Sequence, residues 1–162
     1  MLSVGYSELV KDLTNFEAIE QSMTVNRRRQ NVRSLRELAD LQACDRRDLS
    51  LIPTLEVIEE HGTEATVGTV AVTLGLDPSR ASRLVSAAIR ARYVSRVASQ
   101  SDGRRVHLEL TAAGNGFVKY AHRYRQDLIR RAMEDWTESD RGQLAVLLAR
   151  FTDALQATAS TD

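Results

Sequence analysis

The sequence has little of several residue types, and each scarcity excludes a class of protein. A single cysteine, Cys44, cannot form an internal disulfide, so the chain is no disulfide scaffold, and we expect a reducing cytoplasm as its location. All apolar runs are short, which predicts no membrane-spanning helix and, at the first residues, no secretion signal. With only two prolines and eight glycines, the sequence offers no linker that would separate two domains.

Net positive charge is also lacking, because 22 basic residues balance 22 acidic ones. The charges are unevenly placed, however. From Pro78 to Leu110, seven arginines stand against only Asp102 and Glu109, a local net charge of +5 that leaves −5 for the remainder. A basic stripe on an acidic body is typical of nucleic-acid-binding proteins.

The spacing of apolar residues predicts a mostly helical chain with one β interruption. Its first part predicts amphipathic helices over about 7–23 and 25–44, or one long helix, because no helix breaker separates them. A further helix is expected to be capped by Ser50, to carry Pro53 in its first turn and to end at Gly62.

The last part of the chain predicts two more helices. The first is expected to run from a cap at Thr111 to about Trp136, roughly 37 Å at about 1.5 Å per residue, too long for a small domain to cover alone. The second begins at Thr137, which with Asp140 resembles a capping box. Such apolar stripes predict a homodimer interface, with these residues buried between or within subunits: Phe117, Tyr124, Leu128, Leu144, Leu148 and Phe151.

Between these parts, two short helices follow each other closely, one over about 66–74 and one that starts at Pro78 after the cap Asp77. This spacing predicts a helix-turn-helix, in which the second helix enters the major groove with its N-terminal residues first. Arginine there can bind guanine, and serine can bind a phosphate or a base edge. The expected DNA contacts on this helix are Ser79, Arg80, Ser82, Arg83 and Ser86. The alternative is an ordinary solvated helix face.

A β-hairpin is predicted next. Apolar and polar residues alternate over 106–110, and the dipeptide Asp102-Gly103 favours a tight turn. The tip carries Arg104 and Arg105, which suit a narrow minor groove, while Asp102 and Gly103 are expected to support the turn. The alternative is an edge hairpin whose charges prevent aggregation.

Two strings in this region resemble the MarR (multiple-antibiotic-resistance regulator) family. VGTVAVTLGLDPSRASRLVSAAIRARYV resembles the family's helix-turn-helix, and SDGRRVHLELTAAG resembles its wing, so the resemblance covers about Leu49 to Gly116. It implies a mainly α fold with a small β-hairpin wing, in which a winged helix-turn-helix over 49–111 is flanked by dimerisation helices over 1–48 and 112–162. Arg104 would be the minor-groove arginine. Arg92 is a departure, since relatives usually have glycine there.

The resemblance also implies a function, a cytoplasmic homodimeric repressor that binds an inverted repeat in double-stranded DNA. A small aromatic or lipophilic ligand would release it from a crevice between the dimer helices and the winged lobe. Candidate residues for this effector pocket are Arg46, Leu55, His61, Tyr120 and Tyr124. The alternative is a closed crevice, with control by protein level alone.

Other functions find less support in the sequence. No phosphate-binding loop, nucleophile elbow or paired metal-ligand motif occurs, so we expect no enzyme, no catalytic or metal site and no cofactor. Two alternatives remain open: a helical module that binds another protein, and a regulator that senses oxidants through Cys44, whose thiolate Arg46 and Arg47 would favour. Against the second stands an inert, partly buried thiol.

Overall fold

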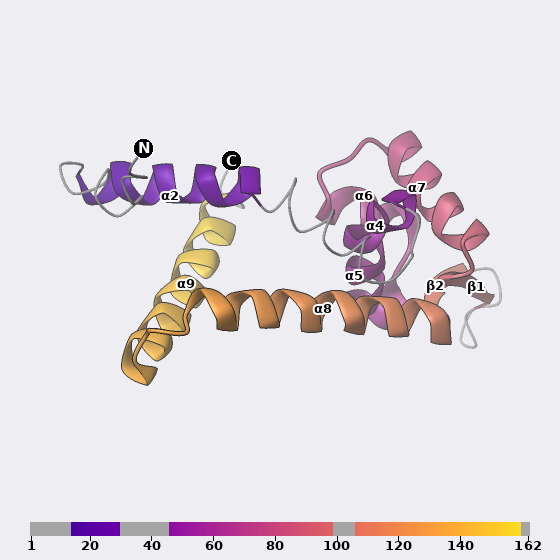
Figure 1. Cartoon of the computed structure of the whole chain (residues 1–162). Helices are drawn as coiled ribbons and strands as arrows, with labels where there is room; N and C mark the ends of the chain where they lie inside the picture. The colour runs from indigo at the N-terminus through magenta and orange to yellow at the C-terminus, as the bar shows by residue number, and fades with distance from the viewer. Residues whose placement is uncertain (1–13, 30–45, 99–105, 160–162) are drawn as a thin grey trace. The chain divides into compact units, whose positions relative to one another are not determined.

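The computed structural model describes residues 14–29, 46–98 and 106–159, and among these the side chains of 27–29, 46–47 and 159 are not described. The described residues are helical apart from one hairpin (Figure 1). The chain divides into two compact units, one reaching to His122 and the other starting at Arg123. None of the described helices has the length and apolar character that a bilayer crossing requires.

Helix α2 (Asn15–Arg29) begins at a capping box that the sequence prediction missed. Glu17 N–H donates to Thr14 Oγ1 at 3.4 Å, and the Glu17 carboxylate accepts from Thr14 Oγ1 at 2.7 Å and from Thr14 N–H at 2.9 Å. The two bonds that the Glu17 carboxylate accepts hold the pKa of Glu17 below its ordinary value, and the bond from the Thr14 hydroxyl has the larger effect. Helix α2 thus begins inside the range of the helix predicted over 7–23, whose residues before Thr14 lie outside the described part of the chain. It continues past Thr24 into the range of the second predicted helix.

Helices α4 (Arg46–Leu49) and α5 (Ile52–His61) follow. The prediction of Ser50 as the cap of α5 is wrong, because Leu51 occupies that position and no side chain caps the helix. Pro53 lies in the first turn, where the missing N–H costs nothing, and the helix ends at Gly62 with φ 52°, as predicted. Half of the residues of α5 are buried, namely Ile52, Thr54, Leu55, Val57 and Ile58.

After the short 3₁₀ helix η2 (Gly62–Glu64) comes the helix-turn-helix of α6 (Val67–Thr73) and α7 (Pro78–Arg90). Thr66 caps α6 by accepting from Thr69 N–H at 3.1 Å. Asp77 caps α7 by accepting from Arg80 N–H at 2.9 Å, as the sequence predicted.

The hairpin consists of β1 (Val94–Ala98) and β2 (Val106–Leu110), which pair antiparallel with Val94 opposite Leu110. Leu108 N–H donates to the Ala65 carbonyl at 2.8 Å, which ties β2 to the segment before α6. Val94 and Leu108 are both buried, so the base of the wing is part of the core.

Two long helices complete the chain, α8 (Ala112–Ala132) and α9 (Glu138–Ala159). Thr111 caps α8 by accepting from Gly114 N–H at 3.1 Å, and Thr137 caps α9 by accepting from Asp140 N–H at 3.1 Å, both as predicted. The prediction that α8 reaches Trp136 is wrong: the helix ends at Ala132, and turns follow.

Candidate nucleic-acid interface

Helix α7 separates an apolar face from a polar one. Ala81, Val85 and Ala88 are fully buried at 0% exposure, which fixes the rotation of the helix about its axis. On the opposite side lie Ser79, Arg83, Ser86 and Arg90, at spacings of four, three and four residues. At about 100° per residue these four fall within a sector of roughly 60° and extend over about 16 Å. Ser86 is half-buried and the other three are exposed. We call this set the outward stripe.

The other two predicted contacts on α7, Arg80 and Ser82, lie at the margins of the outward stripe and are exposed. Arg80 is held in the first turn, since its backbone N–H bonds the cap Asp77. The structure therefore brings all five residues predicted on this helix to its accessible side.

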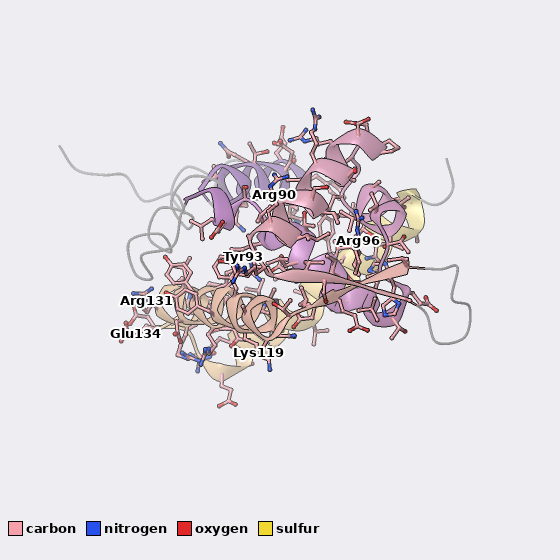
Figure 2. All side chains as sticks on the ribbon, turned by 90° about the vertical axis from the view of Figure 1, so that its right-hand side faces the viewer. Arg90, Tyr93, Arg96, Lys119, Arg131 and Glu134 are labelled. Atoms are coloured by element: carbon pink, nitrogen blue, oxygen red, sulfur yellow. The ribbon has the colours of Figure 1, made fainter. Side chains whose placement is uncertain are left out.

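This surface has no acidic residue in sequence from Pro78 to Ala98, where five arginines occur. Among the described residues, no carboxylate forms an ion pair with any of these arginines. Figure 2 shows two of them, Arg90 at the end of α7 and Arg96 on β1. Unpaired, exposed guanidinium groups on one lobe can bind a polyanion, since charge repulsion among them is relieved only by a counter-charge.

The base of the wing is joined to the start of α8 by two hydrogen bonds that Thr111 donates. Thr111 N–H donates to the Tyr93 carbonyl at 2.9 Å, and Thr111 Oγ1 donates to the Arg92 carbonyl at 2.7 Å. The wing tip, with Asp102, Gly103, Arg104 and Arg105, lies outside the described residues. For the wing, the structure therefore shows the two paired strands and the hydrogen bonds that hold their base.

Residues 52–105 of the chain match the model of the MarR family, a segment that holds the helix-turn-helix and the first strand of the hairpin. Over this segment the chain is similar to the MarR family. The remainder of the chain has the fold of MarR-type regulators as well, since solved MarR structures match nearly its whole length. No curated protein matches the chain significantly in sequence.

Three solved structures illustrate the similarity. A MarR family protein from Bacillus stearothermophilus is 16% identical, with a TM-score of 0.71 over 95% of this chain and 99% of that one. RV1404 from Mycobacterium tuberculosis is 23% identical, with a TM-score of 0.68 over 87% and 94%. FabT from Streptococcus pneumoniae, solved in complex with DNA, is 20% identical, with a TM-score of 0.67 over 88% and 99%.

The residues predicted for a MarR-type effector pocket lie in different environments. Leu55 is fully buried and Tyr124 is 7% exposed. His61 and Tyr120 are half-buried, and His61 Nδ1 donates to the Val57 carbonyl at 2.9 Å. The side chain of Arg46, like Cys44, lies outside the described residues.

A shallow pocket of about 270 Å³ lies elsewhere on the first unit, between the end of α5, β2 and the start of α8. It is lined by Ile58, Glu59, Gly62, Thr63, Leu108, Glu109, Leu110 and Asn115. None of the five residues predicted for the effector pocket lines this hollow.

Besides Arg92, two further exposed arginines were left out of the predicted contact set although they lie on the same lobe. Arg90 ends the outward stripe of α7, and Arg96 is exposed on β1, opposite Leu108. The absence of any acidic residue between positions 78 and 98 was the signal that could have included both. On α7 the predicted contact set stops at Ser86, before the last turn of the helix.

Proposed function

We propose that this protein is a homodimeric, DNA-binding transcriptional repressor that reads an inverted repeat. The observation that carries the proposal is the outward stripe of α7, whose exposed arginines have no acidic partner among the described residues. It is supported by the MarR-type winged helix, and one structure of similar fold, FabT, was solved in complex with DNA.

In this proposal α7 is the recognition helix and lies in the major groove. Arg83, in the middle of the outward stripe, donates two guanidinium N–H groups to guanine O6 and N7, while Ser79 and Ser86 bind base edges or phosphates on either side. Arg80 and Ser82, at the margins of the outward stripe, contact the phosphates of the two DNA strands that border the groove. The cap at Asp77 fixes where the first turn of the helix begins.

The wing supplies the second contact. Arg104 and Arg105 enter the adjacent minor groove, which A·T-rich sequence narrows and makes more negative. Asp102 and Gly103 support the turn that presents them. Arg104→Ala should therefore weaken binding most on operators whose flanks are A·T-rich, and equal losses on G·C-rich flanks would contradict this placement.

The dimer is supported by apolar side chains that the described chain leaves uncovered. On α9, Leu147 is 56%, Leu148 53% and Leu155 48% exposed, and on α2 Phe16 is 86% exposed. Exposed apolar faces of this extent mark interfaces, and a two-fold dimer places two recognition helices on successive turns of the DNA.

Selection of bound sites from a random duplex pool, followed by footprinting, tests the function. We expect an inverted repeat whose half-sites lie about 10 bp apart, centre to centre. Arg83→Ala should bind the selected site more weakly, whereas Arg150→Ala, which removes an exposed charge from α9, should bind as wild type does. A pool that yields no enriched sequence would contradict the proposal.

Release by an effector is a separate part of the proposal. A ligand in the predicted crevice would change the spacing of the two recognition helices, and a coupling of about 2.7 kcal/mol would give a 100-fold loss of DNA affinity. Aromatic acids that raise the thermal stability should then displace the protein from its operator. Acids that bind without displacing DNA would contradict the switch.

A further inference from the structure

The two helices of the helix-turn-helix end in the same backbone motif. At the end of α6, Gly75 N–H donates to the Val72 carbonyl at 3.1 Å, and Leu76 N–H donates to the Ala71 carbonyl at 2.9 Å. This pair of bonds is a Schellman motif, and it requires a left-handed residue just past the helix. Gly75, with φ 61°, is that residue.

At the end of α7 the same two bonds recur. Arg92 N–H donates to the Ile89 carbonyl at 2.9 Å, and Tyr93 N–H donates to the Ala88 carbonyl at 3.0 Å. The left-handed residue is here Arg92, with φ 64°, and among the described residues it is the one non-glycine with positive φ. The same type of turn thus ends both helices, with glycine as the left-handed residue after α6 and arginine after α7.

The backbone of this turn favours glycine over arginine at position 92. The Cβ of arginine makes the left-handed conformation less favourable than it is for glycine, which adopts it freely. In all these bonds residue 92 uses only backbone atoms, including its carbonyl, which accepts from the Thr111 side-chain hydroxyl Oγ1 at 2.7 Å. Glycine would make every one of them, so the side chain is present at a cost in stability.

The surroundings of Arg92 indicate what the side chain binds. It is exposed, and no carboxylate pairs with it among the described residues. The charged residues nearest to Arg92 along the chain are Arg90, the last residue of the outward stripe, and Arg96 on β1. Both are labelled in Figure 2. Like charges this close in sequence repel one another, and an external anion bound by Arg92 would relieve that repulsion.

We propose that Arg92 binds a phosphate of the DNA backbone at the C-terminal end of α7. This inference rests on the proposed function and extends its contact surface beyond the helix itself. A phosphate contact of this kind adds affinity for any sequence and carries no information about the bases. Arginine suits it because its guanidinium stays charged and can donate two bonds to a phosphate.

The test is Arg92→Gly, because it removes the side chain and relieves the backbone in one change. We expect it to unfold at a higher denaturant concentration than wild type, yet to bind the selected operator roughly threefold to tenfold more weakly as a dimer. The plot of log K against log salt concentration should become shallower by about 0.9 for each protomer. The ratio of operator to scrambled-duplex affinity should not change.

Two further variants separate charge from strain. Arg92→Lys keeps the charge and the strain, so it should restore the salt slope without the gain in stability. Gly75→Ala imposes the same strain at the equivalent turn of α6, where an added Cβ meets no atom within 4 Å, so it should lower stability. An Arg92→Gly protein with unchanged salt slope and affinity would overturn the inference, while wild-type protein that selects no DNA would overturn the proposed function instead.

Discussion

Tyr93 stacks on Phe117, with ring centroids 5.0 Å apart and ring planes inclined by 15°. Tyr93 leads into β1 and Phe117 lies in the first half of α8, so the stack joins the base of the wing to the helix that follows it. Tyr93 Oη also donates to Asp48 Oδ2 at 3.0 Å, which adds α4 to the same junction. One side chain thereby fixes the direction of the wing relative to two helices.

The two contacts of Tyr93 can be removed one at a time. Tyr93→Phe keeps the stack and loses the bond to Asp48, which should cost about 1–2 kcal/mol in the free energy of unfolding. Tyr93→Leu also loses the aromatic pair and should cost about 0.5–1.5 kcal/mol more. Urea unfolding measures both, and a Tyr93→Phe protein as stable as wild type would show that the hydroxyl bond contributes nothing.

Substitution of glycine by alanine should have opposite effects on stability at two positions of α8. A Cβ on Gly114 would lie 2.1 Å from the Tyr93 carbonyl oxygen, whereas a Cβ on Gly116 meets no atom within 4 Å. Gly114→Ala must therefore push the wing base away from α8, and we expect a loss of about 1–3 kcal/mol or more. Gly116→Ala should gain up to about 1 kcal/mol, because alanine favours the helix. Equal effects in thermal unfolding would mean that the approach of α8 to Tyr93 is looser than described.

Thr54 of α5 is polar and fully buried, and its hydroxyl has no hydrogen-bond partner among the residues that the structure describes. Thr54→Val keeps the shape and removes the unsatisfied group, so the free energy of unfolding should rise by about 1 kcal/mol. Thr66→Val is the matched control, because that hydroxyl caps α6, and its loss should cost about 1 kcal/mol. A Thr54→Val protein that is less stable than wild type would point to a partner for this hydroxyl.

Helix α9 offers a paired test of the dimer. Leu148 lies on the apolar face and is 53% exposed, while Val146, 60% exposed, lies about 160° away around the helix axis. Leu148→Glu should shift the protein towards monomer, since a charge in an apolar interface loses its hydration. Val146→Glu should leave the dimer intact. Sedimentation at micromolar concentration distinguishes them, and a wild-type protein that is already monomeric would contradict the dimer.

The helix-turn-helix could be predicted closely because the residues that begin and end its helices act locally. Asp77-Pro78 starts α7, Gly75 ends α6, and Thr111 and Thr137 cap the long helices, each through atoms within a few residues. Errors arose where two local signals competed. Ser50 is a better cap than Leu51 by residue type, but a preceding helix, α4, occupies the chain up to Leu49.

Features that depend on distant residues were not predictable. Nothing near Gly114 in sequence shows that Tyr93 approaches it, and nothing near Tyr93 shows Asp48, 45 residues away. The end of α8 was placed too late because polar residues continue the helical pattern past Ala132 without a breaker. For the site, the sequence showed which residues face outward on α7, but the equivalence of Gly75 and Arg92 needed the backbone angles.

The central claim is that the outward stripe of α7 reads bases, and a base-by-base substitution profile of the selected operator tests it directly. Wild-type protein should show, in each half-site, one base pair whose replacement costs about 1–3 kcal/mol because Arg83 binds it. In Arg83→Ala protein that cost should vanish while the costs at other positions remain. An Arg83→Ala protein with the full wild-type profile would contradict the account, because the residue at the middle of the outward stripe would then take no part in recognition.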